Sequence, residues 1–143
     1  MSPRPTWFTA TAGLLLLWAL AGVAACAGHV LAGEQMAAAQ SEWDANFFRA
    51  LPAWFAWDYA VATGASLAGA VALLRRSRLA LGLYAVSLAA VIVQFGYVFA
   101  ATDLIAHKGA AATVPFPVFI AVMGGVQIAV ARMALRRGWI GAD

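Results

Sequence analysis

The chain has 143 residues, of which 64% are apolar and 10% are charged, whereas a soluble domain has roughly 45–50% apolar and about 25% charged residues. A small soluble domain leaves most of its surface in water, so it could not hide this much hydrocarbon. The composition therefore indicates an integral membrane protein. Its 12% aromatic content, net charge of only +3 and single cysteine exclude a disordered chain, a nucleic-acid-binding domain and a disulfide scaffold.

The first apolar stretch lies between Arg4 and Glu34, with no charged residue in between. A helix needs about 20 apolar residues to cross the hydrocarbon layer. Helices are expected because backbone polar groups in lipid must be satisfied within the segment. We therefore predict a first span near residues 11–32, and we exclude a barrel because the continuous Ala/Leu/Val runs do not alternate.

Cys26 allows a second interpretation of this stretch. The run Val23–Cys26 resembles a bacterial lipobox, and an apolar segment behind Arg4 is typical of a signal peptide. Cleavage there would leave a lipidated Cys26 and three spans. The apolar stretch continues to Gly33, which favours an uncleaved helix with Cys26 as a small packing residue; whether Cys26 is a lipidation site stays open.

The segment over residues 34–51 has a different pattern. Its apolar residues recur every three or four positions, and its charged residues occupy other faces, as in an amphipathic helix. The apolar positions are Met36, Ala39, Trp43, Phe47 and Leu51. We predict a short helix over about 34–51 that lies on the outer membrane surface or folds over the outer mouth of the bundle.

Three further apolar stretches predict spans near residues 53–74, 79–101 and 115–136. Pro115 and Pro117 suit the first turn of the last helix, because the amide hydrogen that proline lacks would be unpaired there. Pro52 plays a similar part before the second span. The sequence thus predicts an all-α fold, in which residues 1–143 form one four-helix membrane domain.

The basic residues predict the orientation of this bundle. Seven of the nine would lie on one side, which should be the cytoplasmic side. These seven are Arg4, Arg75, Arg76, Arg78, Arg132, Arg136 and Arg137. Both termini are therefore expected in the cytoplasm, with the helix over 34–51 on the outer side.

Two glutamines are the most informative polar residues within the spans. Gln94 is deep in the third span and Gln127 is near the middle of the fourth. Polar side chains in a bilayer are costly without partners. The two amides could hydrogen-bond each other and fasten the helices, or they could contact a polar solute.

Small residues also recur at helical spacing. Small residues lie four positions apart in the second span at Ala60, Gly64 and Ala68, with Ala65 and Gly69 alongside, and Gly124 and Gly125 are adjacent in the fourth span. This small-xxx-small spacing lets helices approach closely. It predicts a compact bundle more than a defined dimer face.

Four titratable residues come at comparable height toward the outer side: His29, Asp58, Asp103 and His107. Two imidazoles and two carboxylates could bind a divalent metal or relay a proton. They come from separate segments, however, and no HxxxH, CxxC or HExxH spacing supports them. A helix cap, or an interaction with the positive end of the helix dipole, would account for Asp58 without chemistry. The four residues therefore remain weak candidates, and we expect no metal and no other cofactor.

No motif of conventional catalysis is present. The chain has no GxSxG elbow, no phosphate-binding glycine-rich loop with lysine and no dinucleotide-binding fingerprint. We therefore expect that the protein is not an enzyme.

Short segments along nearly the whole chain carry a resemblance to a known family. They are Leu17–Trp18, Gly22–Val23, Leu51–Trp54, Leu73–Arg76, Ser87–Leu88, Val93–Gln94, Tyr97, Ala131–Arg132 and Arg137–Trp139. In this order they resemble a bacterial family of small four-helix membrane proteins commonly labelled "sugar transporter". The resemblance implies a multi-pass protein of the bacterial inner membrane.

The resemblance also implies transport of a small, sugar-like solute. One four-helix bundle is too thin to enclose a sugar-sized path, so a transporter would work as an oligomer with Gln94, Gln127 and Tyr97 along the path. A non-catalytic auxiliary or assembly subunit of a larger membrane complex is an alternative, and a metal-dependent or redox enzyme is another. A polar cavity that reaches both glutamines would favour transport, whereas a dry core around Gln94 would argue against it.

Overall fold

The computed structural model describes residues 2–141, which form seven helices and no strand. Four of these helices are long and apolar enough to cross a membrane: α1 (Thr6–Gln40), α3 (Ala53–Leu74), α4 (Leu79–Ala101) and α7 (Pro115–Arg136). The short helices are α2 (Glu42–Ala50), α5 (Leu104–Lys108) and α6 (Ala110–Thr113). The prediction of an all-α membrane fold is confirmed.

The bounds of α3, α4 and α7 agree with the predicted spans, but those of α1 and α2 do not. Helix α1 continues to Gln40, so residues 34–40 belong to it and not to the predicted helix over 34–51. This segment consists of strong helix formers, chiefly alanine, glutamine and glutamate, so the helix continues through it. The break falls at Ser41, whose extended backbone (φ −166°, ψ 163°) ends α1 and whose hydroxyl accepts the Asp44 amide at 3.0 Å.

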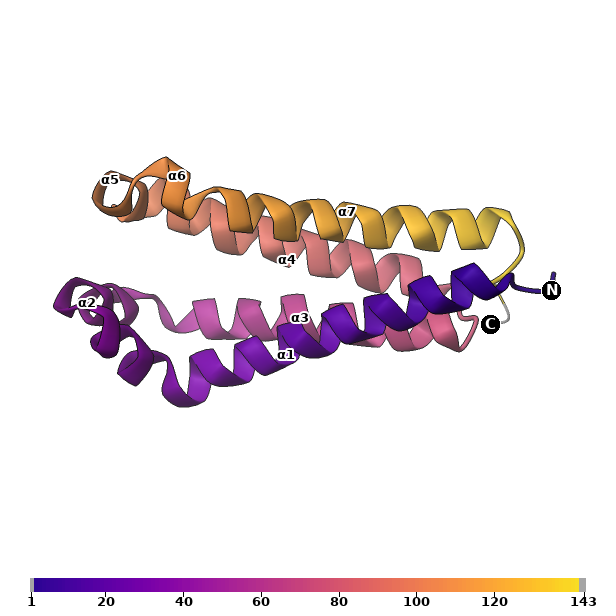
Figure 1. The fold of residues 1–143 in the computed structure, drawn as a ribbon, viewed down its shortest axis with the longest axis horizontal. Coiled ribbons are helices and arrows are strands. Elements are labelled where there is room, and N and C mark those ends of the chain that lie inside the picture. The colour runs from indigo at the N-terminus through magenta and orange to yellow at the C-terminus, as the bar shows by residue number, and fades with distance from the viewer. Residues whose placement is uncertain (1, 142–143) are drawn as a thin grey trace.

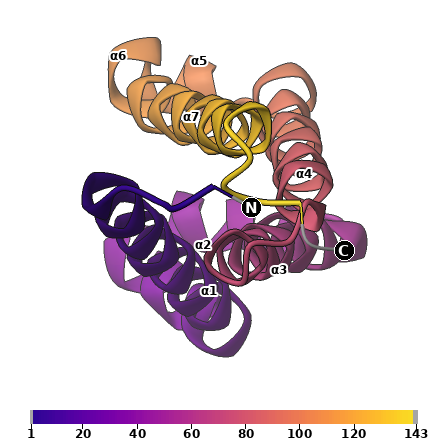
Figure 2. The same ribbon diagram turned by 90° about the vertical axis from the view of Figure 1, so that its right-hand side faces the viewer.

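The four long helices run side by side along the length of the molecule (Figure 1). Both described ends of the chain and the α3–α4 turn lie at one end, which we call the arginine end; α2, α5 and α6 lie at the other, the α2–α5 end. The main interfaces join α3 to α4, α1 to α3 and α4 to α7. Among the described residues α1 and α7 share no extensive backbone interface, and Figure 2 shows the space between their ribbons.

The arginine end is closed by a tight apolar core. Phe8, Leu73 and Tyr84 are each 0% exposed, and Trp139 and Ile140 from the C-terminal segment are also buried. The Phe8 and Trp139 rings lie 5.0 Å apart. This packing ties the segments before α1 and after α7 to the α3–α4 hairpin.

Two arginines reinforce the same end. The Arg4 guanidinium donates to the Leu74 carbonyl at 3.1 Å, which satisfies a free carbonyl at the end of α3. Arg76 donates to the carbonyls of Ser2, at 2.6 Å, and Trp139, at 3.0 Å. Arginines that the sequence marks as orientation signals therefore also fasten the chain termini.

Helix α3 packs through only part of the small-residue seam that the sequence predicted, at Gly69. Ala60, Gly64 and Ala68 are exposed, whereas Gly69 is buried so closely that an added Cβ would lie 2.8 Å from Cδ1 of Tyr84. The buried face consists of Phe55, Ala62, Ser66, Gly69, Ala70, Ala72 and Leu73. Small residues occur on both faces of this alanine-rich helix, so its spacing alone does not decide which face meets a neighbour.

Helix α2 folds over the end of the bundle. Its Phe48 ring packs against Gly33 of α1, and its Asp44 carboxylate makes an ion pair with Lys108 of α5 at 2.5 Å. Trp43 stacks on His107 with ring centroids 4.0 Å apart. Of the two predicted placements, on the membrane surface or over the end of the bundle, these contacts favour the second.

Candidate functional site

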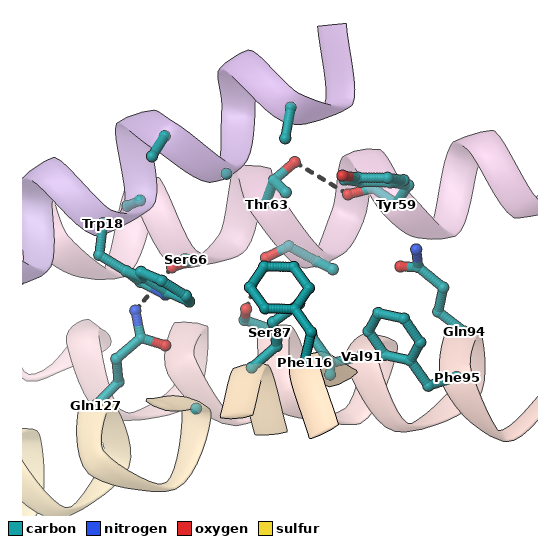
Figure 3. Close-up of a pocket in the computed structure, with 17 residues that line it drawn as sticks. Trp18, Tyr59, Thr63, Ser66, Ser87, Val91, Gln94, Phe95, Phe116 and Gln127 are labelled. Carbon is teal, nitrogen blue, oxygen red and sulfur yellow. Dashed lines mark hydrogen bonds between the residues drawn. The ribbon is translucent and has the colours of Figure 1, made fainter. Parts of the chain in front are cut away.

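A cavity of about 200 Å³ lies between the four long helices, and all four contribute to its walls. Much of the wall is apolar, with aromatic rings from Trp18, Phe95 and Phe116. Its polar side chains are Tyr59, Thr63, Ser66, Ser87, Gln94 and Gln127. None of the lining residues carries a charge, so the cavity suits a neutral group that forms hydrogen bonds (Figure 3).

Gln127 is a structural clamp as well as a lining residue. Its side chain is 2% exposed, and its Nε2 donates to Ser66 Oγ at 2.8 Å. Ser87 Oγ donates to the Ala62 carbonyl at 2.6 Å. These two bonds join α7 and α4 to α3, so these polar groups are already satisfied without a ligand.

Gln94 is in a different situation. It is 6% exposed, lines the cavity, and forms no hydrogen bond with any part of the chain that the structure describes. The predicted bond between the two glutamines is not formed. Figure 3 shows the Gln127 amide beside Ser66 and the Gln94 amide at the other end of the row of polar groups.

The separation of the glutamines follows from helix geometry. Ser87 bonds Ala62, which is one turn of α3 from Ser66, the partner of Gln127. Gln94 lies seven residues beyond Ser87, which is about 10 Å further along α4. The sequence alone predicted similar depths because it does not show how α4 and α7 are shifted along their axes. The amide atoms of Gln94 are open to the cavity, where leaving them without a hydrogen bond is costly unless water or a ligand bonds them.

Tyr97 does not line this cavity. It lies about 4.5 Å further along α4 than Gln94 and packs edge-on against Trp54 in the first turn of α3, with centroids 5.0 Å apart. It borders a separate hollow near the α2–α5 end, together with Trp43 and Asp103. The structure therefore does not bring Tyr97 together with the two glutamines.

The two histidines occupy unrelated places. His29 lies among the rings of Phe48, Phe55 and Tyr59, with centroid distances of 4.9, 5.7 and 5.3 Å. His107 is exposed and stacks on Trp43. Aromatic contacts therefore account for both imidazoles.

The two aspartates do not complete a site with them. Asp58 is in the second turn of α3, which begins at Ala53, so it is not the helix cap that the sequence suggested. Asp103 precedes α5. Across residues 2–141 no three His, Cys, Asp or Glu side chains come close enough to hold a metal ion. The predicted equal height did not mean proximity, because the four residues belong to separate segments.

Cys26 lies inside the uninterrupted helix α1 and is 8% exposed. It follows Ala25, which lines the cavity. Its burial fits the predicted role of a small packing residue.

Sequence reasoning missed several lining residues, notably Trp18, Tyr59 and Phe116. Trp18 did leave a signal, since it lies well inside an apolar span, whereas membrane tryptophans are enriched at the interfaces. The sequence does offer Ser66 as a polar residue of the second span, but its pairing with Gln127 depends on which face of α3 is buried.

No protein-family model, curated protein or solved structure matches this chain. The fold and the cavity define a multi-pass helical membrane protein with a small uncharged site between its spans. The function must therefore be inferred from that site.

Proposed function

We propose that the protein binds a small, neutral, hydrogen-bonding solute in this cavity and moves it through the membrane. The observation that supports this best is the unpartnered Gln94 amide in a cavity that Gln127 also lines. A solute hydroxyl or carbonyl would satisfy Gln94, and the absence of charged lining residues disfavours an ion. A sugar-like solute, as the family resemblance implies, has this chemistry.

The cavity of about 200 Å³ is below the range of roughly 300–1,000 Å³ that is typical of ligand pockets. One chain therefore has room for one small polar group and encloses no continuous path, because the core at the arginine end is closed. Transport would need either a shift of the helices or assembly of several copies. We favour an oligomer for this reason.

We also propose that the membrane is the bacterial inner membrane and that the arginine end faces the cytoplasm. The test uses Arg75→Cys and Ala106→Cys, each in a Cys26→Ala background, with a thiol reagent that cannot enter intact cells. Ala106→Cys should be labelled in intact cells, and Arg75→Cys only after lysis. Labelling of Arg75→Cys in intact cells would reverse the proposed orientation.

Uptake by purified protein in lipid vesicles tests the proposed transport. Radiolabelled glucose, xylose and glycerol serve as neutral probes, with protein-free vesicles as the baseline. We expect Gln94→Ala to reduce uptake to that baseline, whereas Gln35→Ala, an exposed glutamine of α1, should retain it. Equal uptake by the two variants, or no uptake above baseline by the unchanged protein, would contradict the proposal.

An exposed stripe on α3 favours a second candidate, a non-catalytic subunit of a membrane complex. Ala60, Gly64 and Ala68 are exposed, and a Cβ added to Gly64 would meet no atom within 4 Å. Such a surface permits close approach of another helix. Gly64→Leu should then abolish copurification with a partner and Gly82→Leu should not; purification of the unchanged protein only as a lone monomer would count against this candidate.

A further inference from the structure

The cavity is open on one side of the bundle. Three of its lining residues are exposed: Ala21 and Ala25 of α1, and Phe116 of α7, which is 67% exposed. We call these three residues the mouth. They lie where α1 and α7 face each other without an extensive backbone interface, and an edge contact between Trp18 and Phe119 spans the two helices, with centroids 5.6 Å apart.

Buried apolar side chains follow the cavity toward both ends of the bundle, although α7 adds none at the α2–α5 end. Toward the arginine end, the cavity is followed by the core that contains Leu73 and Tyr84, both 0% exposed. Toward the α2–α5 end, the residues that follow the cavity are Cys26 of α1, Phe55 of α3 and Val98 of α4. Each is at most 8% exposed. A solute from water would have to displace one of these apolar layers.

The surface around the mouth is hydrocarbon-like. Leu17 of α1 is 62% exposed and Phe119 of α7 is 49% exposed. The sequence has no charged residue between Arg4 and Glu34 or between Lys108 and Arg132, so these surfaces are suited to the acyl chains of a bilayer. The mouth therefore opens toward lipid and not toward water.

From this geometry we infer that the ligand is amphipathic: an uncharged polar head enters the cavity sideways between α1 and α7, while its apolar tail stays in the bilayer. The inference rests on the proposed function and narrows its substrate class to molecules such as an alkyl- or lipid-linked sugar or glycerol. The small volume fits a head group, and the tail needs no enclosed space because it lies against the lipid-facing surface. The head would bond Gln94, whose amide has no partner in the described chain.

The test compares two probes that share one head group. Tritiated octyl glucoside and tritiated glucose are titrated against the full chain in phosphatidylcholine nanodiscs, with empty nanodiscs subtracted. We expect saturable binding of octyl glucoside that is at least tenfold tighter than that of glucose. Gln94→Leu should weaken it at least tenfold, since the head loses its hydrogen-bonding partner.

A matched pair of variants tests the route. Ala25→Trp places a bulky ring in the mouth, and Ala24→Trp places the same ring on an adjacent exposed position that does not line the cavity. Binding of octyl glucoside should fall at least tenfold in Ala25→Trp and stay within twofold of normal in Ala24→Trp. Equal loss or equal retention in the two variants would overturn lateral entry.

The outcomes separate the inference from the proposed function. Glucose binding as tight as that of octyl glucoside would favour a soluble solute and overturn the amphipathic ligand. Octyl glucoside binding that is unchanged in Gln94→Leu would also overturn it. Binding as expected, with no flux of either probe in vesicles, would support the inference about the ligand and contradict the proposed transport.

Discussion

Replacement by leucine should affect the two cavity glutamines in opposite directions. Gln94 is 6% exposed as a residue and its amide, which is open to the cavity, has no partner in the described chain; an unsatisfied polar group in a buried site costs about 1–3 kcal/mol. Leucine removes that amide and keeps a similar volume. We expect Gln94→Leu to raise the free energy of unfolding by about 1 kcal/mol, the lower figure applying because water can hydrate part of the cavity.

Gln127 should show the reverse effect. Gln127→Leu removes the 2.8 Å bond to Ser66, and an interhelical bond in a membrane protein contributes about 0.6 kcal/mol. It also leaves the Ser66 hydroxyl without this partner. We therefore expect the free energy of unfolding to fall by about 1 kcal/mol, so the two variants should differ by about 2 kcal/mol.

Reversible unfolding in mixed micelles, driven by added SDS and followed by far-ultraviolet circular dichroism, measures both changes. Gln35→Leu is the control, since Gln35 is an exposed residue of α1 and its replacement should change little. A lower stability of Gln94→Leu would refute the reasoning, because Gln94 would then have a hydrogen-bonding partner in the folded protein and would not be free to bind a ligand.

The packing of α3 and the contact between α2 and α5 allow two further predictions. Gly69→Ala should lower the free energy of unfolding by about 1–3 kcal/mol, because the added Cβ would lie 2.8 Å from the ring of Tyr84. The control is Gly64→Ala, whose Cβ would meet no atom within 4 Å. This variant should unfold at the same SDS fraction as the unchanged protein or at a higher one. The hydrogen bond with Lys108 holds the pKa of Asp44 below its ordinary value of 3.8, so this contact stabilises the fold above that pH and is lost as the pH falls through the lowered pKa. The protection of α2 amides, corrected for the intrinsic pH dependence of hydrogen exchange, should therefore fall in acid, and Asp44→Asn should already show lower protection at pH 7. Equal protection in both proteins at pH 7 would contradict this role.

The sequence alone determined the number and the approximate bounds of the membrane-crossing helices. Each apolar stretch is a property of consecutive residues, and proline at the start of α7 acts on its own turn. The seven arginines also predicted that both chain ends belong to one end of the bundle. The boundary between α1 and α2 was less predictable, because residues 34–40 form a good helix whichever helix they join.

Only the tertiary structure decided which side chains meet. Gln127 bonds Ser66 and Gln94 bonds no described residue, although both are similar amides within apolar spans. The cavity and its mouth depend on how four helices are rotated about their axes and shifted along them. Those rotations and shifts are set jointly by contacts such as Gly69 against Tyr84, between residues that are distant in sequence, and the pattern along a single helix does not contain them.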